Sequence, residues 1–157
     1  MQDCGMVPLS RKSPVPPDRC NLARAVDQIG DRWTLLILRS ALYGVRRFDD
    51  FQTELGTPRT ILSGRLKSLV DSGLLAKRTY KVEGRRARPE YVLTTKGEAL
   101  RPVLIALNQW GDQWLESEGQ PPISFTDSQS RQAVRIAFVT EDGREVSVEN
   151  MRIVLRR

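Results

Sequence analysis

The sequence predicts a mainly α-helical α+β fold, in which a helix-turn-helix is followed by a β-hairpin. Apolar residues recur at helical spacing between residues 21 and 72, with breaks at Gly30 and Gly56. Two segments rich in β-forming residues, 74–82 and 90–94, then enclose a basic stretch. The length of 157 residues fits one domain with an appendage, so a second catalytic domain has no room.

The chain is expected to begin its core with two helices. Residues 21–29 carry apolar side chains at helical spacing until Gly30 interrupts the pattern. Asp31 is then placed to cap a second helix, Arg32 to Leu42. Because this second helix is apolar on most sides, we expect it to be the central and most buried helix.

The next two helices make the helix-turn-helix candidate. A short helix covers roughly Phe48 to Leu55 and stops at Gly56. Thr57 and Pro58 have the pattern of an N-cap followed by proline at the first helical position. The helix that follows is expected to end at Gly73, where glycine suits a left-handed C-terminal residue. Its predicted inward stripe comprises Ile61, Leu62, Leu66, Leu69 and Val70.

A long helix is expected after the first β-hairpin. Thr95 and Glu98 have the spacing of a capping box, so we expect the helix to begin there. Its apolar positions continue to about Glu118, and Pro102 is expected to bend it after the first turn or two.

The C-terminal part is expected to add a second β-hairpin. Val134 to Phe138 and Val146 to Val148 alternate around an Asp142-Gly143 turn, whereas the pattern of Met151 to Leu155 does not decide its structure. The predicted organisation is a flexible proline-rich arm (1–19), a helix-turn-helix domain (20–119), and a linker with the C-terminal hairpin (120–157).

Composition argues against an enzyme and against a metal site. The chain has no histidine, which removes the commonest general base and the commonest zinc ligand. Its two cysteines, Cys4 and Cys20, fit neither a redox pair nor a metal knuckle, so we expect no metal and no cofactor. Because no apolar run reaches membrane-spanning length, the expected location is the cytoplasm, without membrane attachment.

The excess positive charge is concentrated in one part of the chain. Lys plus Arg number 25 against 19 Asp plus Glu, a net charge of +6. Residues 58–90 contain nine basic and three acidic residues, and the rest of the chain is balanced. Affinity for DNA depends on how many cations meet phosphates on one face, so double-stranded DNA is the expected partner.

Particular residues can be assigned to DNA contact. Arg59, Thr60 and Ser63 lie opposite the apolar stripe and are the candidates for reading bases. Gly64 would let the helix backbone come close to DNA, and Lys67 lies on the same outward side. The hairpin-tip residues Arg85, Arg86 and Arg88 would contact the flanking backbone or the narrow minor groove, and Arg65 is a further candidate. For Arg65 two interpretations stay open, because it can reach a phosphate or pair with an acid inside the protein.

The sequence also resembles a known family over roughly Cys20 to Trp114. The residues that carry the likeness include Cys20, Ile29-Gly30, Trp33 to Leu38, Arg47-Phe48, Leu62-Ser63, Arg65-Leu66, Gly73-Leu74, Glu90-Tyr91, Leu93-Thr94 and Trp110-Gly111. Together they resemble the HxlR-type winged helix-turn-helix regulators, which are MarR-like. The resemblance implies a winged helix-turn-helix. Many such proteins end soon after the long helix, so the C-terminal β-hairpin expected here is an addition to the family pattern.

The resemblance further implies a homodimeric bacterial transcription factor. Terminal helices would form the dimer, and each subunit would place one helix in the major groove. Two-fold symmetry then requires a palindromic operator, with half-sites about 34 Å or a multiple apart. The rival interpretations are a winged-helix module that binds protein or RNA without an effector, and a small enzyme for which we see no catalytic set.

Two candidate sites concern a signal. Several members of that family sense oxidants or electrophiles through a cysteine where Cys20 stands, and a helix start near Arg19 and Arg24 favours a thiolate. The alternative is a buried, inert cysteine. Trp33, Trp110 and Trp114 are candidates for a small-molecule effector pocket, although their spacing also suits plain core or a dimer seam. The expected function is a DNA-binding repressor that responds to a small molecule or a thiol-reactive signal.

Overall fold

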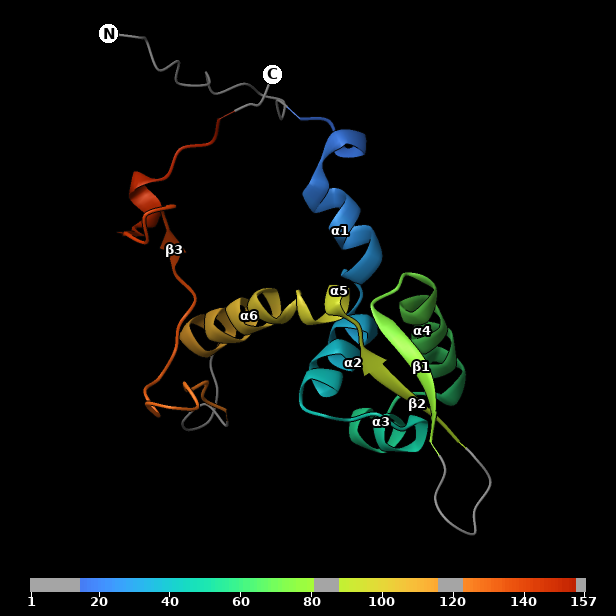
Figure 1. The fold of residues 1–157 in the computed structure, drawn as a ribbon. Helices are drawn as coiled ribbons and strands as arrows, with labels where there is room; N and C mark the ends of the chain where they lie inside the picture. Colours follow the sequence, from blue (N-terminus) through green and yellow to red (C-terminus); the bar gives the residue numbers. More distant parts are fainter. Residues whose placement is uncertain (1–14, 81–87, 116–122, 155–157) are drawn as a thin grey trace, which may run out of the picture.

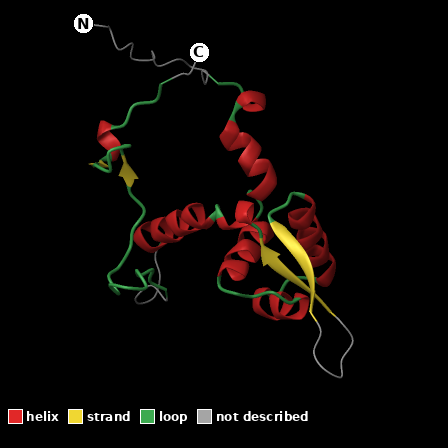
Figure 2. Ribbon diagram, viewed as in Figure 1, coloured by secondary structure: helices red, strands yellow, loops and turns green. Residues whose placement is uncertain are grey.

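The hydrophobic core lies where the first helices meet a two-stranded hairpin (Figure 1). A computed structural model describes residues 15–80, 88–115 and 123–154. Its elements in chain order are η1 (Pro17–Arg19), α1 (Asn21–Ile29), α2 (Arg32–Leu42), α3 (Phe48–Leu55), α4 (Arg59–Asp71), β1 (Leu75–Tyr80), β2 (Arg88–Leu93), α5 (Thr95–Glu98), α6 (Arg101–Trp114), β3 (Phe138–Val139), β4 (Glu145–Val146) and η2 (Val148–Asn150). The predicted α+β winged helix-turn-helix is confirmed, with helices dominating (Figure 2).

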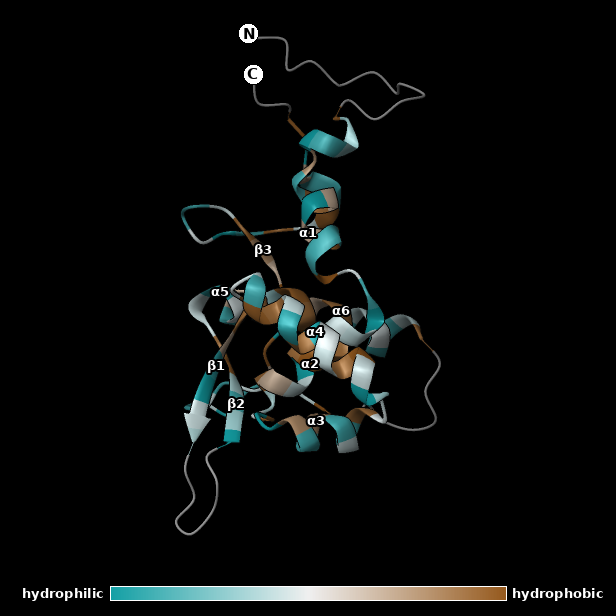
Figure 3. Ribbon diagram, turned by 90° about the vertical axis from the view of Figure 1, so that its right-hand side faces the viewer, coloured by the Kyte–Doolittle hydropathy of each residue, from teal (hydrophilic) through white to brown (hydrophobic). Residues whose placement is uncertain are grey.

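Three helices and the start of the hairpin supply the buried side chains. Among the described residues these are Ile37, Leu38, Phe51, Leu62, Leu66, Leu69, Leu74 and Leu75. In Figure 3 the hydrophobic colour is strong around α2, which contacts both α4 and α6. Burial of this cluster removes apolar surface from water and fixes which side of α4 faces outward.

The glycines that follow α3 and α4 are as predicted, but the cap of α4 is not. Gly56 and Gly73 both have positive φ angles, +59° and +71°, as a left-handed C-terminal residue requires. The predicted N-cap Thr57 is wrong, because α4 begins at Arg59 and Pro58 occupies the N-cap position without a side-chain cap. Thr57 is instead buried.

The second predicted cap is also displaced by one residue. Thr94, not Thr95, caps α5: its Oγ1 accepts a hydrogen bond from the Gly97 N–H (3.1 Å) and donates to the Gly73 carbonyl (2.6 Å). Thr94 therefore ties the start of α5 to the end of the helix-turn-helix. The single long helix is wrong as well, because the chain forms the short α5 and then α6, with Pro102 in the first turn of α6.

The hairpin is joined to the helical body by an isolated bridge. β1 and β2 pair antiparallel, with Lys77 opposite Tyr91, and β2 begins earlier than expected because Pro89 is accommodated opposite Thr79. The Tyr91 N–H donates to the Arg46 carbonyl at 2.7 Å, and Arg47 forms the bridge with Glu90. The orientation of the hairpin is thus coupled to the connection between α2 and α3.

The C-terminal extension contains a smaller hairpin than the sequence predicts. β3 and β4 pair Phe138 with Val146, as expected, but each strand has only two residues. Residues before β3 are held by α6 instead: Gln109 Nε2 donates to the Val134 carbonyl (3.0 Å) and Gln109 Oε1 accepts from the Ile136 N–H (3.0 Å). In the described part, residues 151–154 form no strand.

Two helices carry apolar side chains that the fold leaves uncovered. α1 projects away from the body (Figure 1), and neither α1 nor α6 contains a buried residue. Leu22 and Val26 are 72% and 53% exposed on α1, and Trp110 and Trp114 are 56% and 66% exposed on α6. In the predicted arm, residues 17–19 form a 3-10 turn, and residues 1–14 lie outside the described ranges. Within the three described ranges, no helix has the length and apolarity needed to span a membrane.

Candidate nucleic-acid interface

The outward face of α4 is polar and open to solvent. Leu62, Leu66 and Leu69 are fully buried on its inner side. Rotation about the helix axis therefore turns Arg59, Thr60, Ser63, Gly64 and Lys67 outward, and all five are exposed. Ile61, which the sequence places on the inward stripe, is 39% exposed and lies at the edge of the outer face.

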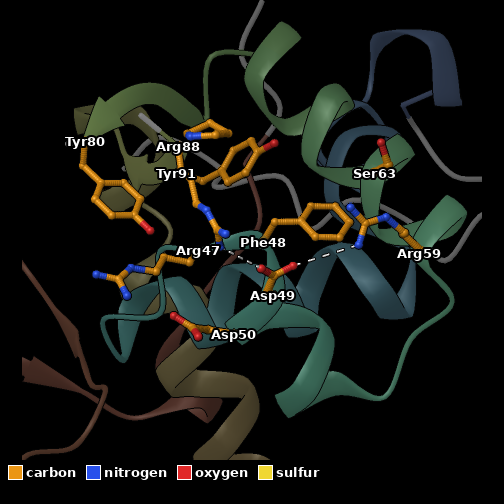
Figure 4. Close-up of a pocket in the computed structure, with 10 residues that line it drawn as sticks. Arg47, Phe48, Asp49, Asp50, Arg59, Ser63, Tyr80, Arg88 and Tyr91 are labelled. Carbon is orange, nitrogen blue, oxygen red and sulfur yellow. Dashed lines mark ion pairs between the residues drawn. The ribbon is translucent and has the colours of Figure 1, made fainter. Parts of the chain in front are cut away.

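One carboxylate joins α4 to the hairpin. Asp49, in the first turn of α3, lies 4.0 Å from Arg59 Nη1 and 3.6 Å from Arg88 Nη1 (Figure 4). The Arg59 guanidinium also lies over the Phe48 ring, 4.7 Å from its centroid. All three charged side chains are at least 64% exposed, so these ion pairs are weak and readily exchanged.

The same residues surround a cleft of about 620 Å³ between α3, α4 and the hairpin. Its walls bring together basic and aromatic side chains that the sequence did not assign to DNA contact. Arg47 lies over the Tyr80 ring at 4.6 Å from the centroid, and Tyr91 and Ser63 complete the wall (Figure 4). Burial raises the pKa of Tyr91, so this phenol stays protonated at neutral pH.

Arg47 reaches this face although it precedes the basic segment of the sequence. The concentrated charge begins at residue 58, whereas Arg47 is brought to the same face through the bridge to Glu90. The Arg46-Arg47 pair directly before α3 was the available signal. Only the strand pairing shows that this position and the hairpin are neighbours.

Arg65 forms an ion pair with an acid of the same chain, at the protein surface. Its Nε lies 3.3 Å from Oδ1 of Asp31, the residue that caps α2. Asp31 also accepts hydrogen bonds from the N–H groups of Trp33 and Thr34 (3.1 Å each) and from the Thr34 hydroxyl. Of the two interpretations left open, the intramolecular ion pair is the arrangement observed.

The Asp31 carboxyl is held in its charged form. Partial burial opposes its ionisation, but the hydrogen bonds from Thr34, the charge of Arg65 and the N–H of Trp33 outweigh that effect and lower its pKa. The ion pair between Asp31 and Arg65 thus links α4 to the start of α2.

The remaining assigned cations differ in position. Lys67 is paired with Asp71 one turn along α4 (2.5 Å) and stays 77% exposed. Arg88 begins β2. Arg85 and Arg86 lie in residues 81–87, outside the described ranges.

The predicted signal residues are separate from this face. Cys20 is half-buried and occupies the N-cap of α1, whereas Cys4 lies outside the described residues. Trp33 is half-buried with the Arg32 guanidinium 5.5 Å from its ring centroid. None of the three tryptophans lines the cavity between α2 and α6, and their part in an effector site stays a prediction. Among residues 15–80, 88–115 and 123–154, no group of potential ligands is arranged to hold a metal ion.

Known proteins with similar sequences and structures are described as transcription regulators. Rv3095 of Mycobacterium tuberculosis, an uncharacterized HTH-type transcriptional regulator, is 44% identical over 105 residues, which are 67% of this chain. The match spans 65% of the length of that relative, which is just under two thirds. The solved structure of PA1607, a candidate transcription factor, has a TM-score of 0.74 and 36% identity over 86% of this chain and 94% of its own.

A second solved structure, the candidate transcription factor PA1374 of Pseudomonas aeruginosa, has a TM-score of 0.60 and 36% identity. It covers 87% of this chain and 92% of its own. The model of the HxlR-like helix-turn-helix family matches residues 28–119, well over half of the sequence. With helix, turn, helix and hairpin in the observed order, the chain belongs to the HxlR-like helix-turn-helix family.

Proposed function

We propose that the protein is a sequence-specific DNA-binding regulator of transcription. The observation that carries this proposal is the outward face of α4, where exposed polar residues lie beside a basic hairpin. A helix of this kind fits the major groove, and the hairpin beside it reaches the flanking backbone.

We divide the candidate DNA-contact residues into two roles. Arg59, Thr60 and Ser63 lie in the first half of α4 and would contact base edges. Arg47, Lys67, Arg85, Arg86 and Arg88 would neutralise phosphates without reading sequence. At Gly64 an added Cβ would meet nothing within 4 Å, so the helix backbone is open to close approach by DNA.

The proposed active species is a homodimer. Leu22 and Val26 of α1 and Trp110 and Trp114 of α6 form exposed apolar faces on two helices that contain no fully buried residue. Contiguous exposed apolar faces mark interaction sites. Two copies related by a two-fold axis would present two α4 helices to a palindromic operator.

We assign the protein the role of a cytoplasmic repressor whose occupancy of the operator changes with a signal. The signal would be a small molecule or a thiol-reactive compound that alters the distance between the two α4 helices. The competing proposal, a winged-helix module that binds protein or RNA, predicts little dependence on DNA sequence.

Fluorescence anisotropy tests the proposal. The full chain is titrated into labelled duplexes from the region upstream of its own gene, with unlabelled random duplex and structured RNA as competitors. We expect one duplex to stay bound in the presence of excess competitor. Footprinting on that duplex should then show protection of a palindromic sequence. Equal displacement by random DNA or by RNA would contradict sequence-specific DNA recognition.

A further inference from the structure

A second cavity, of about 540 Å³, lies between α2 and α6 and is walled by the C-terminal extension. Its apolar lining comes from three parts of the chain: Leu35 and Leu36 of α2, Leu104 and Ile105 of α6, and Ile123 and Phe125 of the extension. Its volume falls in the range of pockets that hold small organic molecules. It is also distinct from the cleft beside α4, with which it shares no lining residue.

The charged side chains that line this cavity all have the same sign. Arg39 and Arg101 line it, and no Asp or Glu among the described residues does. Each arginine is paired through one nitrogen with an acid outside the lining, Arg39 with Glu54 (2.9 Å) and Arg101 with Glu98 (2.5 Å). A guanidinium has five N–H groups, so each retains donors for a second anion.

Two polar atoms at the cavity wall have no hydrogen-bond partner among the described residues. They are Arg39 Nε and Asn108 Oδ1, and both are buried. A buried polar atom without a partner is costly, so a ligand that reaches it after a small side-chain rotation gains binding energy. The cavity thus combines an apolar lining with a few polar groups, Arg39 on α2 and Arg101 and Asn108 on α6.

We propose that this cavity binds an organic acid with an apolar body. The carboxylate would be held by Arg101 and Arg39, and the hydrocarbon or aromatic body would fill the space between Leu36, Leu104 and Phe125. Asn108 would supply an amide to a further polar group of the ligand. The guanidinium donors favour a carboxylate, and the apolar lining disfavours sugars and strongly hydrated inorganic anions.

The position of the cavity gives binding a consequence for DNA recognition, and this step rests on the proposed function. α2 begins at Asp31, which holds Arg65 of α4, and α6 carries one of the apolar faces assigned to the dimer. A ligand between α2 and α6 would therefore shift the dimer face relative to α4. The change in the free energy of DNA binding equals the difference between the ligand's binding free energies for the DNA-free and the operator-bound protein.

Isothermal titration calorimetry with the full chain tests the site directly, without DNA. The probes are 2-naphthoate and decanoate, and their methyl esters serve as neutral counterparts. Loss of the charge-assisted hydrogen bonds should weaken binding of an ester about tenfold or more. Preference between the two acids distinguishes an aromatic from an aliphatic ligand.

Matched variants separate the cavity from nonspecific binding. Arg101→Gln should weaken acid binding and leave ester binding unchanged, whereas Arg152→Gln, an exposed arginine of the extension, should change neither. Ile105→Phe, which fills the cavity, should weaken both probes, and thermal unfolding followed by circular dichroism verifies that each variant is folded.

Three results would overturn the proposal. The first is the absence of binding for both acids over a range of temperatures, because the cavity then does not accept this class of ligand. The second is equal affinity for acid and ester, and the third is equal weakening in the Arg101→Gln and Arg152→Gln variants. Operator binding measured by anisotropy on the same samples reports separately on the proposed function.

Discussion

Arg65 of α4 lies 3.3 Å from Asp31, the residue that caps α2. The candidate recognition helix is therefore linked to the central helix by a carboxylate that also serves as a helix cap. Side-chain exposures of 44% and 33% place the pair at the surface rather than in the core. The Coulomb energy of the ion pair is therefore modest, and the helix cap provides the larger part of the stability that Asp31 contributes.

Replacement of Asp31 separates these two contributions. Asp31→Ala should lower the free energy of unfolding by about 1 kcal/mol at neutral pH, because the cap and the ion pair are both removed. Asp31→Asn keeps a capping oxygen and should cost only a few tenths of a kcal/mol, on the order of an exposed ion pair. Urea denaturation of both variants measures the difference, and equal losses of stability would assign the whole effect to charge.

The same residue predicts a dependence on pH. The pKa of Asp31 is lowered in the folded protein, so its ionised form stabilises the fold above the unfolded pKa. That contribution is lost as the pH falls through the folded pKa, in the acid range below the ordinary value of 3.8. The gap in stability between wild type and Asp31→Ala should therefore narrow there, and a gap that widens in acid would be inconsistent with this linkage.

Arg59 and the hairpin arginines should differ in what they do to DNA binding. Arg59→Ala should cost about 1 to 3 kcal/mol on the operator and relax base preference at one position of each half-site. Arg85→Ala with Arg86→Ala should weaken binding to all sequences and reduce the salt slope by about 1 for each phosphate that is no longer neutralised. Anisotropy at several salt concentrations distinguishes the two patterns, and sequence-blind weakening by both changes would contradict the division of roles.

Asp49 should act as a competitor for DNA phosphates. Asp49→Asn frees Arg59 and Arg88 and removes a negative charge from the face, so affinity for random duplex should rise more than affinity for operator. Asp50→Asn is the matched control, because Asp50 lines the same cleft but forms no ion pair among the described residues. If the two variants gain affinity equally, the bridging position of Asp49 is irrelevant and net charge explains the effect.

Two glycines should respond in opposite ways to alanine. At Gly97 an added Cβ would overlap the Leu74 carbonyl oxygen and lie 2.8 Å from Leu93 Cδ2, so Gly97→Ala should destabilise the fold by about 1 to 3 kcal/mol. Gly64→Ala, in an open helical position, should stabilise it by up to about 1 kcal/mol while obstructing close approach to DNA. Denaturation and anisotropy on both variants test this contrast.

If the thiol of Cys20 senses the signal, its removal should change the response of operator binding to thiol-reactive compounds. Diamide or a quinone should change operator binding by the wild type, and Cys20→Ser should abolish that change while leaving basal binding intact. Cys4→Ser is the control for the second thiol of the chain. A Cys20→Ser variant that responds like the wild type would remove the thiol-sensing proposal.

The sequence predicted the helices and the polar face of α4 because both follow from local periodicity. Leu62, Leu66 and Leu69 fix one side of that helix whatever surrounds it. The caps at Thr57 and Thr95 were wrong by one residue, because tertiary contacts decide between neighbouring positions. Thr94 caps α5 while its hydroxyl also donates to Gly73, which is 21 residues away in the chain.

Other features depend on contacts that no local pattern contains. The ion pair of Arg65 could be assigned only once α4 was seen to pass the start of α2. Arg47 could be added to the candidate interface only once its bridge to Glu90 of β2 was seen. The cavity between α2 and α6 is lined by residues of both helices and of the extension, including Tyr43 and Phe125, and no local spacing brings these three segments together. The shortened C-terminal hairpin has a similar cause, since α6 takes the hydrogen bonds that strands would have used.

Gln109 of α6 takes the place of a neighbouring strand. Its side-chain amide donates to the Val134 carbonyl and accepts from the Ile136 N–H, as a strand backbone would. The extension is consequently carried by α6 rather than by the body of the protein. Any turn of α6 about its own axis would sweep Val134 and Ile136 through an arc, and the residues beyond them would travel further. A small rotation of α6 would in this way produce a larger displacement of β3 and β4.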